Sequence, residues 1–312
     1  MLVHVRKKYA CKNGEETVKR APLPKHPIPK SIATPGLLSH LIVSKYKDHL
    51  PLYRMEFILN RMGVDIARKT LSSWMIKSAT LLTPLIRLMQ SKMRGYDVAY
   101  ADETPMQVLS EPGRAPERKS YMWVFGGGPP EQMNWLYFYS SSRSHEVPLE
   151  HLGDYSGYLH CDGYKGYDAL SHRTHTIQVA CWAHCRRKFI EAKKLSRKPG
   201  LASWWLNHLQ KLFKLESIAK KSNIPPAEIY EMRQTKALPI LNKMRAWLTE
   251  NISKVPKEST LGKAFIYADN QWEKLLNYCE DGRLEMTNNR TERRVKPFTI
   301  GRKNWLFCQM YF

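Results

Sequence analysis

The spacing of apolar and polar residues divides the chain into four stretches, and the first has neither a helical nor a strand period. Five prolines fall between positions 22 and 35, and proline excludes a regular helix. Lysines and arginines surround them, so we expect residues 1–35 to form an extended basic arm. Cys11 has no second cysteine about three residues on, as a zinc site requires. We therefore predict no complete zinc site in this arm.

The second stretch, residues 36–94, repeats apolar side chains every three or four positions, which is typical of helices. The pattern predicts helices over 36–50, 51–62, 67–74 and 81–93. A break at Gly63–Ile66 gives the order helix, turn, helix. In a helix-turn-helix element the second helix contacts DNA, and Arg68 and Lys69 stand at its start. We predict a helical DNA-binding region of this kind; the alternative is an ordinary helical hairpin.

The third stretch is rich in strand patterns. Apolar runs and alternation predict strands over 96–102, 120–125, 134–140, 157–162 and 176–181. A turn is expected at Gly126–Pro130, so the first three strands can form an antiparallel meander. A helix is expected over 144–152. Strands interleaved with helices predict an α/β layered domain with a mixed sheet.

The fourth stretch returns to helical spacing. Residues 183–250 are rich in lysine and arginine, and residues 261–296 contain two further helical segments. We expect the last helix to be capped by Thr287 or Asn288 and limited by Pro297.

Charge is distributed unevenly within the net value of +22. Residues 1–95 hold 18 Lys or Arg against 5 Asp or Glu, residues 96–180 hold 6 against 11, and residues 181–312 hold 26 against 12. An acidic centre between basic flanks suits cations held by the centre and a polyanion held by the flanks, which indicates nucleic acid. The alternative is a generally basic protein without such a partner.

Compartment can be inferred from what the sequence lacks. No apolar run approaches the roughly 18 residues needed to span a membrane, and the N-terminus has no apolar stretch of a signal peptide. The six cysteines are sparse and irregularly spaced, unlike a disulfide framework. We expect a soluble intracellular protein with reduced thiols and no membrane partner.

Three acidic residues stand where a catalytic metal site would place them. Asp102 ends the first predicted strand and Asp162 ends the fourth, while Glu292 lies on the last predicted helix. Carboxylates at a sheet edge can share two magnesium ions about 3.5–4 Å apart, which activate an attacking oxygen and stabilise the leaving oxygen of a phosphodiester. Taken singly, such residues are more often turn residues or members of surface ion pairs.

Four blocks carry a resemblance to a known family: ADETPMQVL, LHCDGYKGYD, CWAHCRRKF and NNRTERRVKPFTIGRKNWLF. In order and spacing they resemble the signature blocks of bacterial transposases of insertion sequence family 66. The resemblance implies an RNase H-like catalytic domain whose DDE carboxylates are Asp102, Asp162 and Glu292, with two Mg²⁺ or Mn²⁺ ions. It implies a mobile-element enzyme that cuts and rejoins DNA at element ends and target, as a homodimer or larger assembly, in the bacterial cytoplasm at the nucleoid.

The resemblance also suggests a domain organisation. Between Asp162 and Glu292 lie 129 residues, more than the simplest version of the fold needs. We therefore expect a catalytic core over 95–182 and 261–307, interrupted by a helical insertion over 183–260.

The chain departs from the family pattern in three places. Members have a longer N-terminus with a zinc-binding CxxC pair, so residues 1–35 are interpreted as a degenerate remnant of that region. Thr287 stands where members often have Asp, and members continue past NWLF, whereas this chain ends at Phe312. We expect a reading frame truncated at both ends. The alternative functions are a catalytically incompetent DNA-binding remnant that represses intact relatives, and a nuclease acting on RNA or hybrids.

Secondary candidates surround the acids. Cys181, His184 and Cys185 are candidates for binding metal or DNA, or for packing at a strand-to-helix corner, and a tetrahedral zinc would need two further ligands, so zinc is not expected. For the basic residues that follow Cys185 the alternative is a solvated helix surface, and for the segment Gly301–Trp305 it is core packing by Trp305 and Phe307. The remaining candidates share positive charge or an amide suited to DNA phosphates. They are Arg186, Arg187, Lys188, Asn289, Arg290, Arg293, Arg294, Arg302 and Lys303.

Overall fold

The structure is a computed structural model that describes residues 5–10, 18–22, 24–195, 200–305 and 308–309. The chain forms two compact units, residues 1–84 and residues 85–312. Cys11, on which the zinc prediction for the arm depends, lies outside the described residues.

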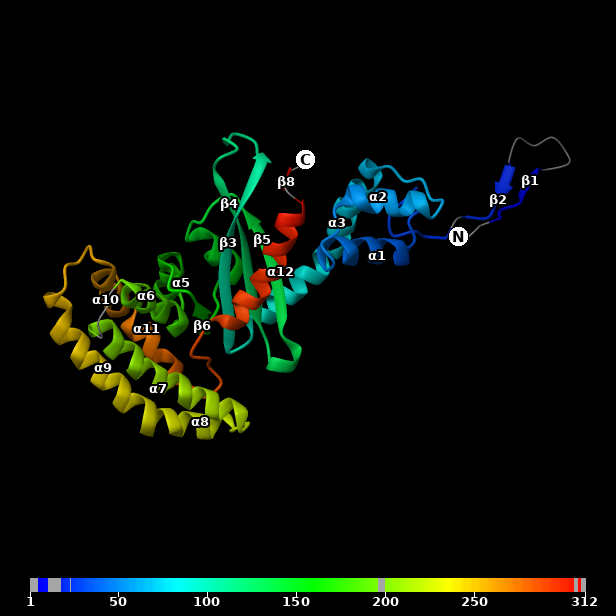
Figure 1. Cartoon of the computed structure of the whole chain (residues 1–312). Coiled ribbons are helices and arrows are strands. Elements are labelled where there is room, and N and C mark those ends of the chain that lie inside the picture. The colour runs from blue at the N-terminus through cyan, green and yellow to red at the C-terminus, as the bar shows by residue number, and fades with distance from the viewer. Residues whose placement is uncertain (1–4, 11–17, 23, 196–199, 306–307, 310–312) are drawn as a thin grey trace. The chain divides into compact units, whose positions relative to one another are not determined.

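The first unit is mainly helical and has a small core of its own (Figure 1). Its elements are β1 (Lys8–Ala10), β2 (Val18–Arg20), α1 (Pro35–Tyr46), α2 (Leu52–Arg61) and the first part of α3 (Arg68–Arg94). The two short strands pair antiparallel. Leu41, Met55 and Trp74 from the three helices are buried together. The Glu56 carboxylate accepts a hydrogen bond from the backbone N–H of Arg68, so α2 supplies the cap that starts α3.

The helices predicted over 67–74 and 81–93 are a single helix, so the predicted break between them is wrong. α3 runs without interruption from Arg68 to Arg94 and contains Pro84. Residues 75–83 include neither glycine nor proline, so nothing in that stretch breaks the helix. The apolar period weakens there because most of these side chains are exposed and packing does not select them.

The second unit is built on a mixed sheet. Its strands are β3 (Val98–Ser110), β4 (Lys119–Gly127), β5 (Asn134–Ser140), β6 (Gly157–Cys161) and β7 (Thr176–Ala180). The order across the sheet is β5-β4-β3-β6-β7. The first three strands are antiparallel, which confirms the predicted meander, and β6 and β7 run parallel to β3. This α/β arrangement is compatible with an RNase H-like fold. The short β8 (Cys308–Gln309) pairs with the far end of β3.

The helices of this unit pack against the sheet or against one another. They are α4 (Glu146–Leu152), α5 (Asp168–Arg173), α6 (Trp182–Lys194), α7 (Leu201–Lys221), α8 (Pro226–Met232), α9 (Leu238–Asn251), α10 (Thr260–Asn270), α11 (Trp272–Leu276) and α12 (Asn289–Trp305). One face packs against α4, α5 and the end of α3. Figure 1 shows α12 lying across the sheet, and the helices from α6 to α11 gathered on the side where β6 lies.

The helical layer from α6 to α11 has its own apolar core and a buried ion pair. Phe189 and Trp205 stack with ring centroids 4.6 Å apart in that core. Arg233, in the π-helical turn Arg233–Ala237 between α8 and α9, is only 1% exposed and pairs with Glu216 at 2.7 Å. Its guanidinium also donates to the carbonyls of Tyr278, Asp281 and Leu284. This arginine therefore ties the helical layer to the segment that leads into α12.

Two further boundaries differ from the prediction. Gly126 lies within β4 rather than in a turn, and a Cβ there would lie 2.4 Å from the Trp135 ring, so glycine is needed for that ring to cross the strand. Pro297 lies inside α12 and does not end it. Proline disturbs the carbonyls of the preceding turn, and the Tyr137 hydroxyl donates to one of them, that of Arg294, at 2.9 Å.

Candidate active site

The parallel register of β3 and β6 brings the two aspartates level with each other. Tyr100 pairs with His160 in that register, and their rings stack with centroids 4.9 Å apart. Asp102 and Asp162 each stand two residues beyond this pair, so the two acids lie level with each other at neighbouring positions. Asp162 directly follows β6, as predicted, whereas Asp102 lies inside β3, which continues to Ser110. The prediction that Asp102 ends its strand is wrong because β3 pairs with β4 well past that point.

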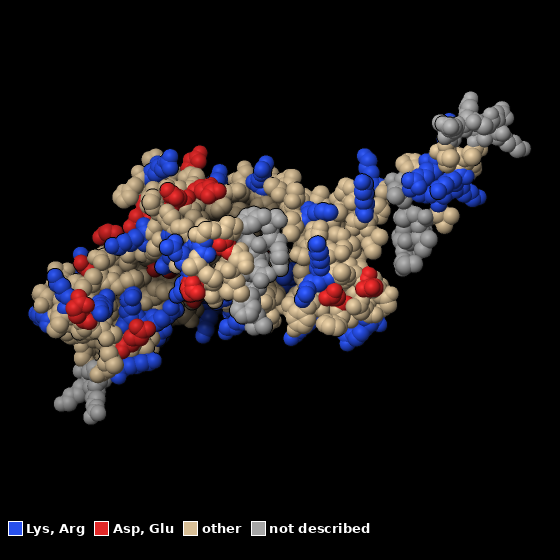
Figure 2. Space-filling view, turned by 90° about the horizontal axis from the view of Figure 1, so that it is seen from above, with Lys and Arg blue, Asp and Glu red and all other residues tan. Residues whose placement is uncertain are grey.

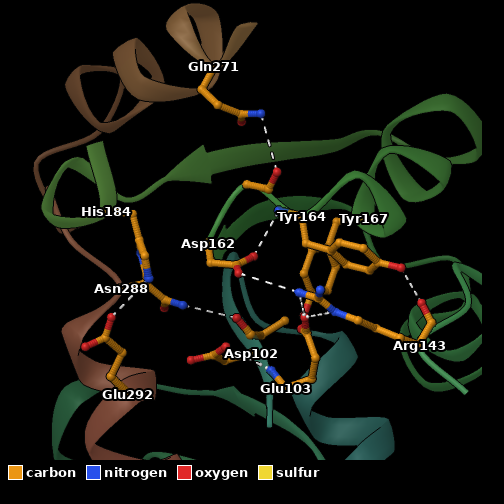
Figure 3. A network of polar contacts seen from close by, with 12 residues as sticks. Asp102, Glu103, Arg143, Asp162, Tyr164, Tyr167, His184, Gln271, Asn288 and Glu292 are labelled. Carbon is orange, nitrogen blue, oxygen red and sulfur yellow. Dashed lines mark hydrogen bonds and ion pairs between the residues drawn. The ribbon is translucent and has the colours of Figure 1, made fainter. Parts of the chain in front are cut away.

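Glu292 is brought to the aspartates by Asn288, which is fully buried at the start of α12. The Asn288 side-chain amide donates to the carbonyl of Ala101 at 3.2 Å, one residue before Asp102. Its side-chain oxygen accepts from the Thr291 hydroxyl, and its backbone carbonyl accepts from the N–H of Glu292. Figure 3 shows Asn288 between Glu292 and Asp102, with Asp162 close by. The sequence marked the Asn-Asn pair but could not tell which asparagine points inward.

Asp102 lies among other carboxylates in a largely buried position. The pKa of Asp102 is raised to about 8, mainly by burial and then by the charges of Asp162, Glu103 and Glu292, while a backbone hydrogen bond from Glu103 opposes the shift. An acid that resists ionisation beside other carboxylates is stabilised in its charged form by a bound cation.

The donor set suits Mg²⁺ or Mn²⁺ in chemistry, because carboxylate oxygens are the ligands these ions prefer. Within the described parts of the chain, however, no three His, Cys, Asp or Glu side chains are grouped closely enough to hold an ion. Glu292 instead lies 3.5 Å from His184 Nε2 and 3.8 Å from Arg187 Nη2. The structure thus sets two aspartates together and places the glutamate nearby with basic partners.

The turn that carries Asp162 is held by α10 and the residue after it. The Tyr267 hydroxyl donates to the carbonyl of Asp162 at 3.0 Å, and the Gln271 amide donates to the carbonyl of Gly163 at 3.3 Å. Gly163 has a φ of +86°, and a Cβ there would lie 2.8 Å from the Gln271 side chain. Sequence reasoning missed both supporting residues, since they stand more than a hundred positions from Asp162.

The Cys-Trp-Ala-His-Cys segment divides between core and site. Cys181 and Cys185 are fully buried, and burial raises the pKa of both thiols. Cys181 accepts a hydrogen bond from the backbone N–H of Asn288 at 3.2 Å, so it helps to seat α12. His184 faces Glu292 from the first turn of α6 (Figure 3). Burial lowers the pKa of its imidazole, partly opposed by the charge of Glu292.

The basic candidates on α6 lie beside the acids but differ in their surroundings. Arg187 is exposed and lies near Glu292. Arg186 is exposed over the Phe213 ring, and Lys188 lies 4.8 Å from the centroid of Tyr267. In Figure 2, lysines and arginines on the visible face are interspersed with acidic side chains. The candidates on α6 are therefore selected by their place beside the acids.

The candidates on α12 fall into exposed and partnered residues. Asn289, Arg293 and Lys303 are exposed. Arg294 is exposed over the Trp135 ring, and Arg302 donates to the carbonyl of Pro105. Arg290 pairs with Glu285 at 2.5 Å and lies over Tyr100. In the first unit, Arg68 and Lys69 are exposed at the start of α3.

Comparison with known proteins identifies the family. The sequence model described as "Transposase IS66 family" matches residues 30–311. The chain belongs to this family. Its relatives include two proteins of Sinorhizobium fredii (strain NBRC 101917 / NGR234), named uncharacterized protein y4qI and uncharacterized protein y4jD. The first is 32% identical over 99% of this chain, and the second is 30% identical over 97% of it.

Both relatives are longer proteins. This chain spans 58% of the length of y4qI and 61% of the length of y4jD. Across the residues that the structure describes, no helix combines the length and the apolar character needed to cross a membrane.

Proposed function

We propose that this chain carries the RNase H-like catalytic core of a DNA transposase, with Asp102, Asp162 and Glu292 as its catalytic residues. One observation carries the proposal. The register of β3 and β6 sets the two aspartates side by side, and the carbonyl next to Asp102 anchors the helix that bears Glu292. Family membership supports it. In this proposal residues 95–182 and 261–307 form the core, 183–260 a helical insertion and 36–94 a DNA-binding region.

Two phosphoryl transfers would take place at this site. Bound Mg²⁺ or Mn²⁺ would activate the attacking oxygen and stabilise the leaving oxygen. In the first transfer, water attacks a phosphorus at the end of the element, the phosphorus–oxygen bond breaks and a 3′-OH is released. In the second, that 3′-OH attacks a phosphorus of the target DNA, and the 3′ oxygen of the target departs. The same geometry serves both transfers, with the sheet fixing the aspartates and Asn288 fixing the start of the glutamate's helix.

The proposed DNA surface consists of basic or amide side chains on the two helices that flank the acids. They are Arg186, Arg187 and Lys188 on α6, and Asn289, Arg293, Arg294, Arg302 and Lys303 on α12. Arg290 contributes less, because Glu285 already holds it. Arg68 and Lys69 would contact DNA from the first unit. Assembly as a homodimer or larger on DNA, at the bacterial nucleoid, belongs to the same proposal.

Nicking of a supercoiled plasmid tests the catalytic assignment. The purified chain is expected to nick the plasmid in Mg²⁺ or Mn²⁺ and to leave 3′-OH ends. Asp102→Asn and Glu292→Gln should each abolish nicking while leaving plasmid binding intact in a mobility-shift assay. Asp154→Asn, the same change at an exposed turn residue, should nick at the wild-type rate. Full activity of either site variant refutes the assignment.

A protein that binds DNA without cutting it is the second candidate. The pairing of Glu292 with His184 and Arg187 favours it, because those contacts compete with metal binding. Plasmid binding by the wild-type chain without nicking in either metal would establish this second function.

A further inference from the structure

Arg143 lies between β5 and α4 and is held beside the candidate site by a buried carboxylate. Its Nε and Nη2 donate to Glu103 Oε1 at 2.8 and 2.5 Å. The Glu103 side chain is only 1% exposed, whereas that of Arg143 is 40% exposed. The other Glu103 oxygen accepts from the Tyr167 hydroxyl at 2.7 Å. Two N–H groups of the guanidinium therefore converge on one carboxylate oxygen and fix the plane of a group that solvent can still reach.

Burial of the Glu103 carboxylate costs free energy of folding. Burial raises its pKa, and the charge of Asp162 raises it further, while Tyr167 and Arg143 lower it. It follows Asp102 in β3 and so projects to the opposite face, among the buried side chains of the apolar core that includes Tyr167. A buried ion pair is often no more stable than apolar residues of similar size. What this pair supplies is a guanidinium with a fixed orientation.

Tyr164 fixes the same guanidinium from a second direction. The Tyr164 ring lies 4.0 Å from the Arg143 guanidinium carbon, and the Tyr164 hydroxyl donates to the Arg143 carbonyl. The backbone N–H of Tyr164 donates to Asp162 Oδ1 at 2.9 Å. Arg143 Nη2 lies 4.0 Å from the other oxygen of Asp162. One tyrosine thus sets both the arginine and the aspartate, and Figure 3 shows these side chains together.

The orientation leaves part of the guanidinium available. The hydrogen bonds of Arg143 in the described chain use Nε and Nη2, and none uses Nη1. A planar guanidinium held along one edge presents its remaining N–H groups in a fixed direction, as recognition of a phosphate oxygen requires. The phosphoryl-transfer transition state spreads negative charge over the non-bridging oxygens. A cation already fixed beside those oxygens stabilises the transition state without having to move during the reaction.

We propose that Arg143 is a further catalytic residue, whose Nη1 donates to a non-bridging oxygen of the scissile phosphate when DNA lies over Asp102 and Asp162. Glu103 and Tyr164 are its positioning residues. This inference rests on the proposed transposase function and adds a group that stabilises the reacting phosphate from the Asp162 side. Arg187 lies on the other side of the site, beside Glu292.

The test compares three variants in plasmid nicking. Arg143→Gln alone leaves the buried Glu103 charge without its cationic partner and can destabilise the fold. The deciding variant is therefore Glu103→Gln/Arg143→Gln, which leaves the net charge of the chain unchanged. The double variant should nick about 100-fold more slowly, with the half-saturating Mn²⁺ concentration and the metal-free plasmid Kd each within about threefold of wild type. Arg143→Lys keeps the positive charge but loses the planar guanidinium, so its nicking rate should lie between those of the double variant and the wild type. Arg173→Gln, at an exposed arginine on α5, is the matched control and should match wild type.

A wild-type rate in the double variant overturns the inference, because Arg143 would then serve only to neutralise Glu103. A second measurement decides without cleavage. Plasmid Kd is measured in Ca²⁺, which supports binding without turnover, and in EDTA. The double variant should bind about tenfold more weakly than wild type in Ca²⁺ and equally in EDTA. Equal affinities in both buffers overturn the inference. If the wild-type chain does not nick plasmid but the double variant still binds more weakly in Ca²⁺ alone, the proposed catalysis is rejected and the phosphate contact of Arg143 is retained.

Discussion

The two halves of the candidate site are held in different ways. Asp102 lies inside β3, which pairs with β4 at that level, and Asp162 directly follows β6 in a turn held by Tyr267 and Gln271. Glu292 belongs to the first turn of α12, which is held by side-chain hydrogen bonds of Asn288 and by the Cys181 thiol. A strand ladder moves only as a unit, whereas each side-chain hydrogen bond contributes about 1 kcal/mol. The aspartate half is therefore rigid, and the glutamate half can be displaced.

The side chains around each half of the site are consistent with a rigid aspartate half and a displaceable glutamate half. Glu292 lies against His184 and Arg187, while Asp102 is surrounded by other acids and has a raised pKa. Divalent cations would relieve the repulsion at the aspartates and compete with the basic partners for Glu292. We expect metal binding to move the glutamate towards the aspartates and not the reverse.

Removing Arg233 should have the largest effect, because it anchors the segment before α12. Arg233→Met leaves Glu216 and three carbonyls without their partner, and should lower the free energy of unfolding by about 3–5 kcal/mol. Urea denaturation followed by tryptophan fluorescence measures this. Arg245→Met breaks an exposed pair with Asp269 and should cost less than about 1 kcal/mol. Equal losses in the two variants would mean that the buried pair does not anchor the segment.

Replacing Asp102 should stabilise the metal-free protein at neutral pH. The folded pKa is about 8 and the ordinary value is 3.8, so between these limits the unfolded chain releases a proton that the folded chain retains. The stability of the wild type therefore falls as pH rises from about 4 to about 8. Asp102→Asn removes this loss and should be more stable in EDTA at pH 8, by on the order of 3 kcal/mol.

Thermal melts of the two proteins across that pH range provide the measurement. The Tm difference should grow with pH and vanish near pH 4, and Mg²⁺ should raise the Tm of the wild type only. A Tm difference that does not change with pH would show that the pKa of the Asp102 carboxyl is not raised.

Asn288→Ala should loosen the glutamate half and leave the aspartate half unchanged. It removes the bonds to the Ala101 carbonyl and the Thr291 hydroxyl, and should cost about 1–3 kcal/mol of stability. Plasmid nicking should slow by at least about tenfold, because small misplacements of a catalytic group are costly. Asn289→Ala, at the exposed neighbour, should change the free energy of unfolding by less than about 0.5 kcal/mol. Reversed effects at the two asparagines would contradict the assigned anchor.

The rigid half of the site was also the half that sequence patterns could predict. Strand alternation located β5 with its bounds, and it put Asp102 and Asp162 on separate strands. That the two strands are neighbours could not be predicted, because it depends on how strands pair across the sheet. The helical period identified α12 but not its length, because Tyr137 supports the backbone around Pro297.

The supporting residues could not be predicted from local pattern. Arg143 is 40 positions from Glu103, and Asn288 is 187 positions from Ala101. Arg143 has no periodic or motif signal of its own. Asn288 belongs to the block that begins NNRTERR, but nothing in that block indicates its contact with Ala101, and polar side chains of this kind are more often exposed than buried. Their roles arise from tertiary contacts alone.

The central claim is that the three acids converge on divalent cations, and Mn²⁺ binding measured by electron paramagnetic resonance tests it most directly. The wild-type chain, titrated with Mn²⁺ in the presence of plasmid DNA, should bind up to two ions per chain. Asp102→Asn and Asp162→Asn should lose this binding, Glu292→Gln should weaken it, and Asp154→Asn should retain it. Binding that is absent in the wild type, or unchanged in all three site variants, would contradict the account.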